Sequence, residues 1–134
     1  MQRLFIEQTE LTPEINFSPS EKIFMIRGVS SPEDVRALYY PVIEWIRIYA
    51  DDILESDKKV FTPDSPLTLQ IDLSYFNSSS AKFLYDILME IRRLHIGGVP
   101  VVIEWIYENE DTDMYEAGTD IAELAEMDFI YTAR

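Results

Sequence analysis

The stretch IDLSYFNSSSAKFLYDIL, residues 71–88, decides how this chain folds. It begins inside LTLQIDLSYF, residues 67–76, an apolar run typical of a buried strand, which we expect at the centre of a sheet. From Phe83 to Leu94, apolar residues recur at steps of three and four, and this spacing predicts a helix that Gly97 and Gly98 end. Residues 77–80, Asn-Ser-Ser-Ser, therefore form a strand-to-helix junction.

The chain before this junction predicts three strands and one helix. RLFIEQT, residues 3–9, reads as a first strand, and PEINFSP and KIFMIRG, residues 13–19 and 22–28, read as a hairpin that ends at Gly28. Residues 30–54 carry a long helical stripe. We expect Ser31 to cap this helix and Pro41 to kink or restart it, because proline lacks a backbone donor.

The chain after the junction predicts a strand, a helix and a last strand. VPVVIEWIYE, residues 99–108, is almost continuously apolar, as expected of a strand covered on both faces. DFIYTA, residues 128–133, reads as a final edge strand. Between them lies an acidic helix, residues 111–127, whose expected inward residues are Met114, Ile121, Leu124 and Ala125. The sequence thus predicts an α/β fold over residues 1–134: a single-domain mixed sheet with an N-terminal antiparallel hairpin, parallel βαβ units and about three helices packed on it.

Composition limits the classes of function. With 134 residues, 47% of them apolar, the chain can bury one core, and its lack of cysteine excludes disulfides and thiolate metal sites. No apolar run is long enough to span a bilayer and no signal peptide is evident, so we expect a cytosolic protein. The net charge of −14 disfavours nucleic acid and anionic membranes as partners. After Arg93, acidic residues are frequent and the only Lys or Arg is Arg134. These acids form either a solvated face or a docking surface for a basic partner.

Motifs for catalysis and for cofactor or metal binding are weak. The one histidine, His95, lies 17 residues beyond Ser78, or roughly 25 Å along a helix, so no Ser–His pair forms there. The four glycines match no phosphate-binding loop, and we expect no cofactor. The acidic stretch ENEDTDMYE, from Glu108 to Glu116, leaves open a small metal-binding domain or enzyme, but first-turn acids also stabilise a helix start.

The serines of the junction have two interpretations. Asn and Ser are favoured helix caps, because their side chains accept hydrogen bonds from otherwise unpaired N–H groups. One cap is enough, however, and three consecutive serines exceed that need. A helix start also holds a phosphate well, so a serine here can be phosphorylated without disrupting the fold. From the residues alone, both a capping role and a phosphorylation switch remain open.

Four segments, taken together, resemble the SiaC family of bacterial regulatory phosphoproteins. They are TPEINFS near the start, SSPED before the first helix, YFNSSSAK at the junction and WIYENEDTDMYEAGTDIAEL near the end. The resemblance runs through nearly the whole chain and implies a STAS-like α/β fold. It also implies that Ser78, directly after Asn77, is the phosphorylated residue, with Ser79 and Ser80 as less favoured sites. Family members often carry threonine at this position.

The resemblance further implies a partner-switching protein that is not an enzyme. A SiaB-type kinase is expected to phosphorylate it, and a metal-dependent, PP2C-like phosphatase to reverse the modification. The unphosphorylated form is expected to bind and activate a diguanylate cyclase, and thereby to promote biofilm formation through cyclic di-GMP. The expected partner-contact residues are Tyr75, Asn77, Ser79 and Lys82. The alternative in the same fold group is a STAS-like antagonist that binds an anti-sigma kinase.

Overall fold

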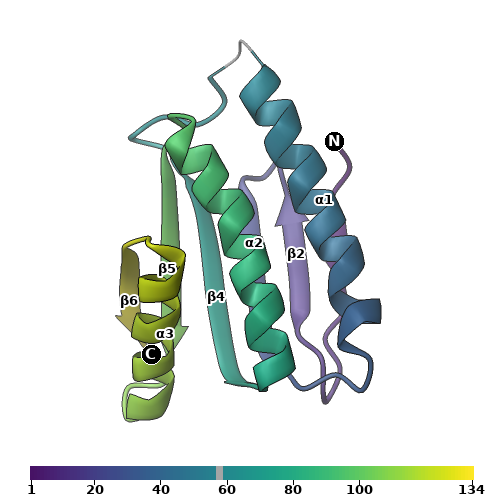
Figure 1. The fold of residues 1–134 in the computed structure, drawn as a ribbon, viewed down its shortest axis with the longest axis vertical. Helices are drawn as coiled ribbons and strands as arrows, with labels where there is room; N and C mark the ends of the chain where they lie inside the picture. The colour runs from purple at the N-terminus through teal and green to yellow at the C-terminus, as the bar shows by residue number, and fades with distance from the viewer. Residues whose placement is uncertain (57–58) are drawn as a thin grey trace.

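The computed structural model describes residues 1–56 and 59–134. It is a single α/β domain with a six-stranded mixed sheet and three helices, which confirms the predicted fold class (Figure 1). None of the helices in the described part of the chain is long and apolar enough to cross a lipid bilayer. The elements, in chain order, are β1 (Leu4–Ile6), β2 (Glu14–Ser18), β3 (Ile23–Ser30), α1 (Val35–Glu55), β4 (Leu67–Phe76), α2 (Ser78–Ile96), β5 (Val101–Tyr107), α3 (Thr112–Ala125) and β6 (Phe129–Ala133).

The strands lie in the sheet in their chain order, from β1 to β6. β1, β2 and β3 pair antiparallel, and β3, β4, β5 and β6 pair parallel. The predicted hairpin and the central place of β4 are therefore confirmed, as is β6 as an edge strand. Because β3, β4 and β5 are parallel, their carboxyl ends meet at one edge of the sheet, where α1, α2 and α3 begin.

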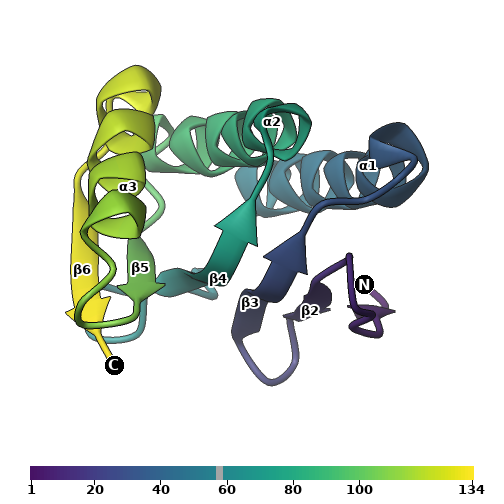
Figure 2. The same cartoon turned by 90° about the horizontal axis from the view of Figure 1, so that it is seen from below.

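All three helices cover the same face of the sheet, as Figure 2 shows from below. The expectation that β5 is covered on both faces was wrong. In β5, Ile103 and Trp105 are each 1% exposed on the helix side. On the other side Glu104 accepts hydrogen bonds from Gln70 of β4 at 2.9 Å and from Thr132 of β6 at 2.7 Å. On the uncovered face, polar side chains of neighbouring strands thus form hydrogen bonds with one another.

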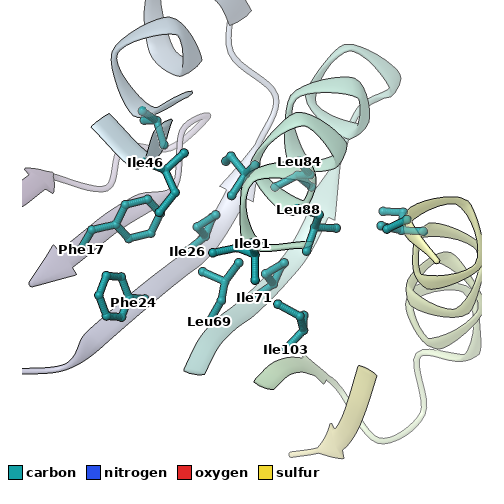
Figure 3. Packing of buried hydrophobic residues seen from close by; sticks show 14 of the residues in the cluster. Phe17, Phe24, Ile26, Ile46, Leu69, Ile71, Leu84, Leu88, Ile91 and Ile103 are labelled. Atoms are coloured by element: carbon teal, nitrogen blue, oxygen red, sulfur yellow. The ribbon is translucent and has the colours of Figure 1, made fainter. Parts of the chain in front are cut away.

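The core lies between the sheet and the helices (Figure 3). Alternate residues of β4 from Leu67 to Leu73 point into it, and α1 and α2 contribute their apolar stripes. Burial on this scale is the main stabilising term of the fold, at about 25 cal/mol per Å² of apolar surface. The core residues labelled in Figure 3 are Phe17, Phe24, Ile26, Ile46, Leu69, Ile71, Leu84, Leu88, Ile91 and Ile103.

Two details of α1 differ from the predictions. Its cap is Asp34, whose carboxylate accepts a hydrogen bond from the Ala37 N–H at 3.1 Å, and not Ser31. The Ser31 backbone N–H instead donates to the Leu11 carbonyl at 2.8 Å, which holds Ser31 in the preceding loop. Pro41 also does not restart the helix, because α1 is one continuous helix from Val35 to Glu55; a kink at Pro41 stays a prediction.

Gly28 and Leu124 also differ from the predictions. Gly28 does not end β3; it adopts φ +121° at a bulge in the pairing with β4, and the strand continues to Ser30. Leu124 is 69% exposed, because α3 turns its small residues Gly118 and Ala122 toward the sheet instead. A Cβ on Gly118 would lie only 2.6 Å from the Trp105 indole nitrogen, so this close helix–sheet packing requires glycine.

Candidate functional site

The junction after β4 is held at two points by Asn77. Its side-chain oxygen accepts a hydrogen bond from the Ser80 N–H at 2.8 Å, which caps α2. Its backbone N–H donates to the Ser30 carbonyl, at the end of β3, at 3.0 Å. The half-buried Asn77 therefore fixes both the start of α2 and its distance from the neighbouring strand.

The three consecutive serines occupy different environments. Ser78 and Ser79, in the first turn of α2, are exposed. Ser80 is fully buried at 0% exposure. The two exposed hydroxyls are accessible to another protein, and the third is not.

Ser80 belongs to a buried chain of hydroxyl groups. Its hydroxyl donates to the Ser30 carbonyl at 3.0 Å and accepts from the Ser30 hydroxyl at 2.8 Å. The Tyr39 hydroxyl, from α1, lies 2.6 Å from the Ser30 hydroxyl. Because the Ser30 hydroxyl donates its proton to Ser80, it accepts the hydrogen bond from Tyr39. The chain links α1, β3 and α2 beneath the exposed serines, so Ser80 has a structural role.

Tyr39 is fixed by packing as well as by hydrogen bonding. Its ring is stacked on Phe83 of α2 with 5.6 Å between centroids and 4° between planes. Burial raises the pKa of the Tyr39 hydroxyl, and its hydrogen bonds to Ser30 and Ser80 oppose this effect. Tyr39 therefore stays neutral and keeps its proton at physiological pH.

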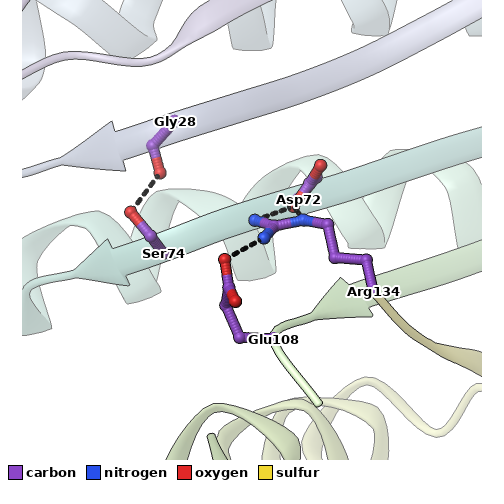
Figure 4. Close-up of polar contacts among 5 residues, drawn as sticks. All are labelled: Gly28, Asp72, Ser74, Glu108 and Arg134. Atoms are coloured by element: carbon purple, nitrogen blue, oxygen red, sulfur yellow. Dashed lines mark hydrogen bonds and ion pairs between the residues drawn. The ribbon is translucent and has the colours of Figure 1, made fainter. Parts of the chain in front are cut away.

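The bulge at Gly28 sets the height at which β3 ends. It shifts the register between β3 and β4 so that Ser30 pairs with Phe76, directly before Asn77. Ser74 donates from β4 to the Gly28 carbonyl at 3.3 Å, on the face away from the helices (Figure 4). Because of this shift, the Ser30 carbonyl can reach both Asn77 and Ser80.

A hollow of about 250 Å³ lies beside the exposed serines, between the first turns of α1 and α2. Ser79 and Lys82 line it from α2, and Arg36 and Tyr40 line it from α1. Lys82 pairs with Asp86 at 2.8 Å, whereas Arg36 has no ion-pair partner within residues 1–56 and 59–134. The hollow therefore has two basic groups on a strongly acidic chain.

The expected site residues come together only in part. Ser79 and Lys82 share the hollow, and Tyr75, 53% exposed, lies three residues before Ser78 at the end of β4. Arg36 and Tyr40 were missed by the sequence interpretation. Parallel βαβ units place the starts of α1 and α2 at one sheet edge, but which of their side chains meet there depends on how the helices pack.

The acidic stretch from Glu108 to Glu116 has structural partners. Asp111 caps α3 by accepting from the Met114 N–H at 3.0 Å. Arg134 bonds to Glu108 and also reaches Asp72 of β4 at 2.7 Å, on the uncovered face of the sheet (Figure 4). These carboxylates raise the pKa of Arg134, with Asp72 contributing most. Across the described residues, no three His, Asp or Glu side chains are arranged to hold a metal ion.

Comparison with known proteins gives matches along the whole chain. The model of the SiaC family regulatory phosphoproteins matches residues 6–133. An uncharacterized protein of Pseudomonas aeruginosa strain UCBPP-PA14 is 29% identical over 133 residues, which cover 99% of this chain and 98% of that protein.

Two solved structures share the fold. The crystal structure of apo-SiaC from Pseudomonas aeruginosa has a TM-score of 0.79 and 28% identity, with 100% of this chain and 99% of that chain covered. A chain in the crystal structure of the diguanylate cyclase SiaD with its activator SiaC, also from Pseudomonas aeruginosa, has a TM-score of 0.82 and 29% identity. That match covers 98% of this chain and 99% of the other.

Proposed function

This chain belongs to the SiaC family of regulatory phosphoproteins, and on that premise we propose that it is a phosphorylation-controlled partner of a diguanylate cyclase. It acts by binding and not as an enzyme. The unphosphorylated form docks on the cyclase and activates it, and phosphorylation at Ser78 prevents docking. The support for a cyclase as partner is the solved complex in which the Pseudomonas aeruginosa relative activates SiaD.

The observation that carries the choice of Ser78 is the contrast between the serines. Ser78 follows the cap residue Asn77 and is exposed. Ser80 is buried, and its hydroxyl both donates and accepts a hydrogen bond within the fold. A kinase reaches Ser78 without opening the fold. Ser79 is also exposed and is the second choice.

The surroundings of Ser78 suit a switch based on charge. A phosphoryl group adds about −1.5 to −2 charges at neutral pH. Lys82 lies one helical turn after Ser78, so a phosphate there competes with Asp86 for the Lys82 ammonium group. A partner that contacts Tyr75, Tyr40 and Lys82 would then meet a dianion where it had met a neutral hydroxyl, and desolvating that dianion opposes docking.

The same arrangement explains why modification leaves the fold intact. The backbone amides of the first turn and the helix dipole favour a negative group at Ser78. The buried chain of Tyr39, Ser30 and Ser80 lies on the other side of the turn and is not altered. A SiaB-type kinase and a metal-dependent phosphatase are the proposed enzymes that add and remove the group.

The test is binding of a purified diguanylate cyclase from the same cells, measured by calorimetry. Ser78→Asp should weaken binding by about tenfold or more, and Ser78→Ala should bind like the unmodified protein while losing phosphate incorporation in mass spectrometry. Ser79→Ala is the matched control and should still be phosphorylated. If Ser78→Asp binds normally and Ser79→Asp abolishes binding, Ser78 is the wrong residue. If unmodified protein does not bind the cyclase, the partner is wrong.

A further inference from the structure

The outer edge of β6 is unpaired in the described structure, because β6 pairs with β5 alone. The Arg134 N–H donates to the Tyr107 carbonyl at 2.9 Å, and the Asn109 N–H donates to the Arg134 carbonyl at 3.1 Å, so the Arg134 backbone faces β5. Backbone groups alternate in direction along a strand. The N–H and C=O groups of Phe129, Tyr131 and Ala133 therefore point outward.

The two edges of the sheet differ in how they are protected. β1, at the other edge, has three residues, and Arg3, just before it, lies over the Phe5 ring at 4.5 Å. β6 has five residues, Phe-Ile-Tyr-Thr-Ala, with no charge, no proline and no bulge in its pairing. Short strands and nearby charges discourage pairing with another chain, and an uncharged, regular edge favours it.

The side of β6 that faces α3 carries a hollow of about 460 Å³. Phe129 and Tyr131 line its floor. The ring centroids of Tyr131 and of Tyr115, from α3, are 5.0 Å apart. Three acids, Glu123, Glu126 and Asp128, lie around it. An aromatic floor with an acidic rim suits the stem and the charge of a lysine or arginine.

Most of this negative charge is uncompensated. Glu126 pairs with Arg92 at 3.5 Å, but Glu123 and Asp128 have no basic partner in the part of the chain that the structure describes. On the opposite side of β6, Ile130 is 55% exposed on the uncovered face of the sheet. A strand added at this edge would thus meet acids on one side and an apolar surface on the other.

We propose that the β6 edge binds an extended segment of a partner protein by strand addition, and that this segment alternates basic and apolar residues. Backbone hydrogen bonds to Phe129, Tyr131 and Ala133 supply the affinity, and the acidic hollow selects the basic side chains. A second copy of this chain is disfavoured as the occupant. Pairing two β6 edges would bring two acidic rims together, and like charges at close range oppose association.

This surface is separate from the Ser78 site. Ser78 begins α2, which packs on the middle of the sheet, whereas β6 lies at the far edge (Figure 1). Binding at the β6 edge does not depend on whether a cyclase binds near Ser78.

Three synthetic peptides of about nine residues test the proposal by fluorescence anisotropy. The first alternates lysine and valine, the second replaces lysine with glutamate, and the third is the first with N-methyl groups on its edge-facing amides. We expect micromolar binding of the first alone, with loss of about tenfold or more for the other two. Equal binding of the methylated peptide, or no binding of the first, would overturn strand addition.

Two protein variants locate the binding surface. Ala133→Pro removes an outward N–H that has no hydrogen-bond partner among the described residues, and it should weaken binding of the lysine–valine peptide at least about fivefold. Glu123→Gln with Asp128→Asn should weaken it about tenfold. The matched control neutralises Glu7 and Glu10, two exposed acids near the β1 edge, and should change binding less than about twofold.

Folding and self-association are checked on the same samples. Circular dichroism checks that each variant is folded. If Ala133→Pro does not fold, the variant with Glu123→Gln and Asp128→Asn still tests the binding surface. Unchanged binding by both edge variants would refute the location. Light scattering tests whether a second copy of the chain occupies the β6 edge. A dimer that Ala133→Pro converts to monomer would show that the edge serves self-association instead.

Discussion

Among the three junction serines, replacement of Ser80 by alanine should destabilise the fold far more than replacement of Ser78 or Ser79. Ser80→Ala removes one hydrogen bond that Ser80 donates to the Ser30 carbonyl and one that it accepts from the Ser30 hydroxyl. The carbonyl keeps the Asn77 N–H as a donor, but the Ser30 hydroxyl loses its acceptor in a fully buried position. A neutral hydrogen bond contributes about 1 kcal/mol and an unmatched buried polar group costs about 1–3 kcal/mol. We therefore expect Ser80→Ala to lower the free energy of unfolding by about 2 kcal/mol.

Urea denaturation followed by circular dichroism measures this difference. With a slope of about 1–3 kcal/mol per molar urea, the Ser80→Ala midpoint should fall by about 1 M. Ser78→Ala and Ser79→Ala are matched controls, and because both side chains are exposed they should change stability by less than about 0.5 kcal/mol.

A double-mutant cycle tests the hydroxyl chain itself. If Ser30 and Ser80 act as a pair, the double alanine variant should cost less than the sum of the two single variants, with a coupling of about 1 kcal/mol. Additive losses would refute the pairing. A Ser80→Ala midpoint equal to that of Ser78→Ala would refute the whole assignment of Ser80 as a structural residue.

Three further predictions follow from other contacts. Asn77→Ala should lower the unfolding free energy by about 1 kcal/mol through loss of the α2 cap, and Asn77→Asp should retain most of it; equal thermal midpoints for Asn77→Ala and the parent would contradict the capping role. Gly118→Ala should destabilise by about 1–3 kcal/mol and shift tryptophan fluorescence, because the new methyl group would displace Trp105 from the Met114 carbonyl, and an unchanged spectrum would oppose this packing. Burial, followed by the charge of Asp52, raises the pKa of Tyr49 to about 12, so this tyrosine contributes stability that is full below its unfolded pKa of about 10 and is lost as pH rises toward 12. Tyr49→Phe should flatten that alkaline loss by on the order of 2 kcal/mol in urea titrations, and an identical pH profile would count against it.

The order and type of the elements could be predicted because their apolar periodicities are strong. β4 alternates cleanly and α2 carries an unbroken stripe, so both were assigned close to their observed bounds. The cap of α1 was misplaced because Ser31 and Asp34 are both good caps, and the choice depends on a tertiary hydrogen bond to Leu11. β5 reads as covered on both sides, because nothing local tells whether Val102 and Ile106 face a helix or solvent.

The candidate site could be predicted as a location but not as an arrangement. The sequence places three hydroxyls at the junction, yet the separation of Ser80 from Ser78 depends on the bulge that brings Ser30 alongside. The involvement of Arg36 and Tyr40 depends on how α1 lies beside α2. Such contacts between elements distant in sequence are set by packing and leave no local signal.

If Ser78 is the phosphorylated residue, as we propose, its place in the first turn of α2 limits how a kinase can recognise it. Asn77 holds the first turn of α2 through its own N–H and its side chain, so this turn does not open without breaking both bonds. An enzyme that threads its substrate as a straightened peptide would have to unwind the turn first. The folded domain itself, and not the linear segment YFNSSSAK, is then the substrate. The fold would thereby shield the proposed Ser78 site from kinases that recognise short linear motifs.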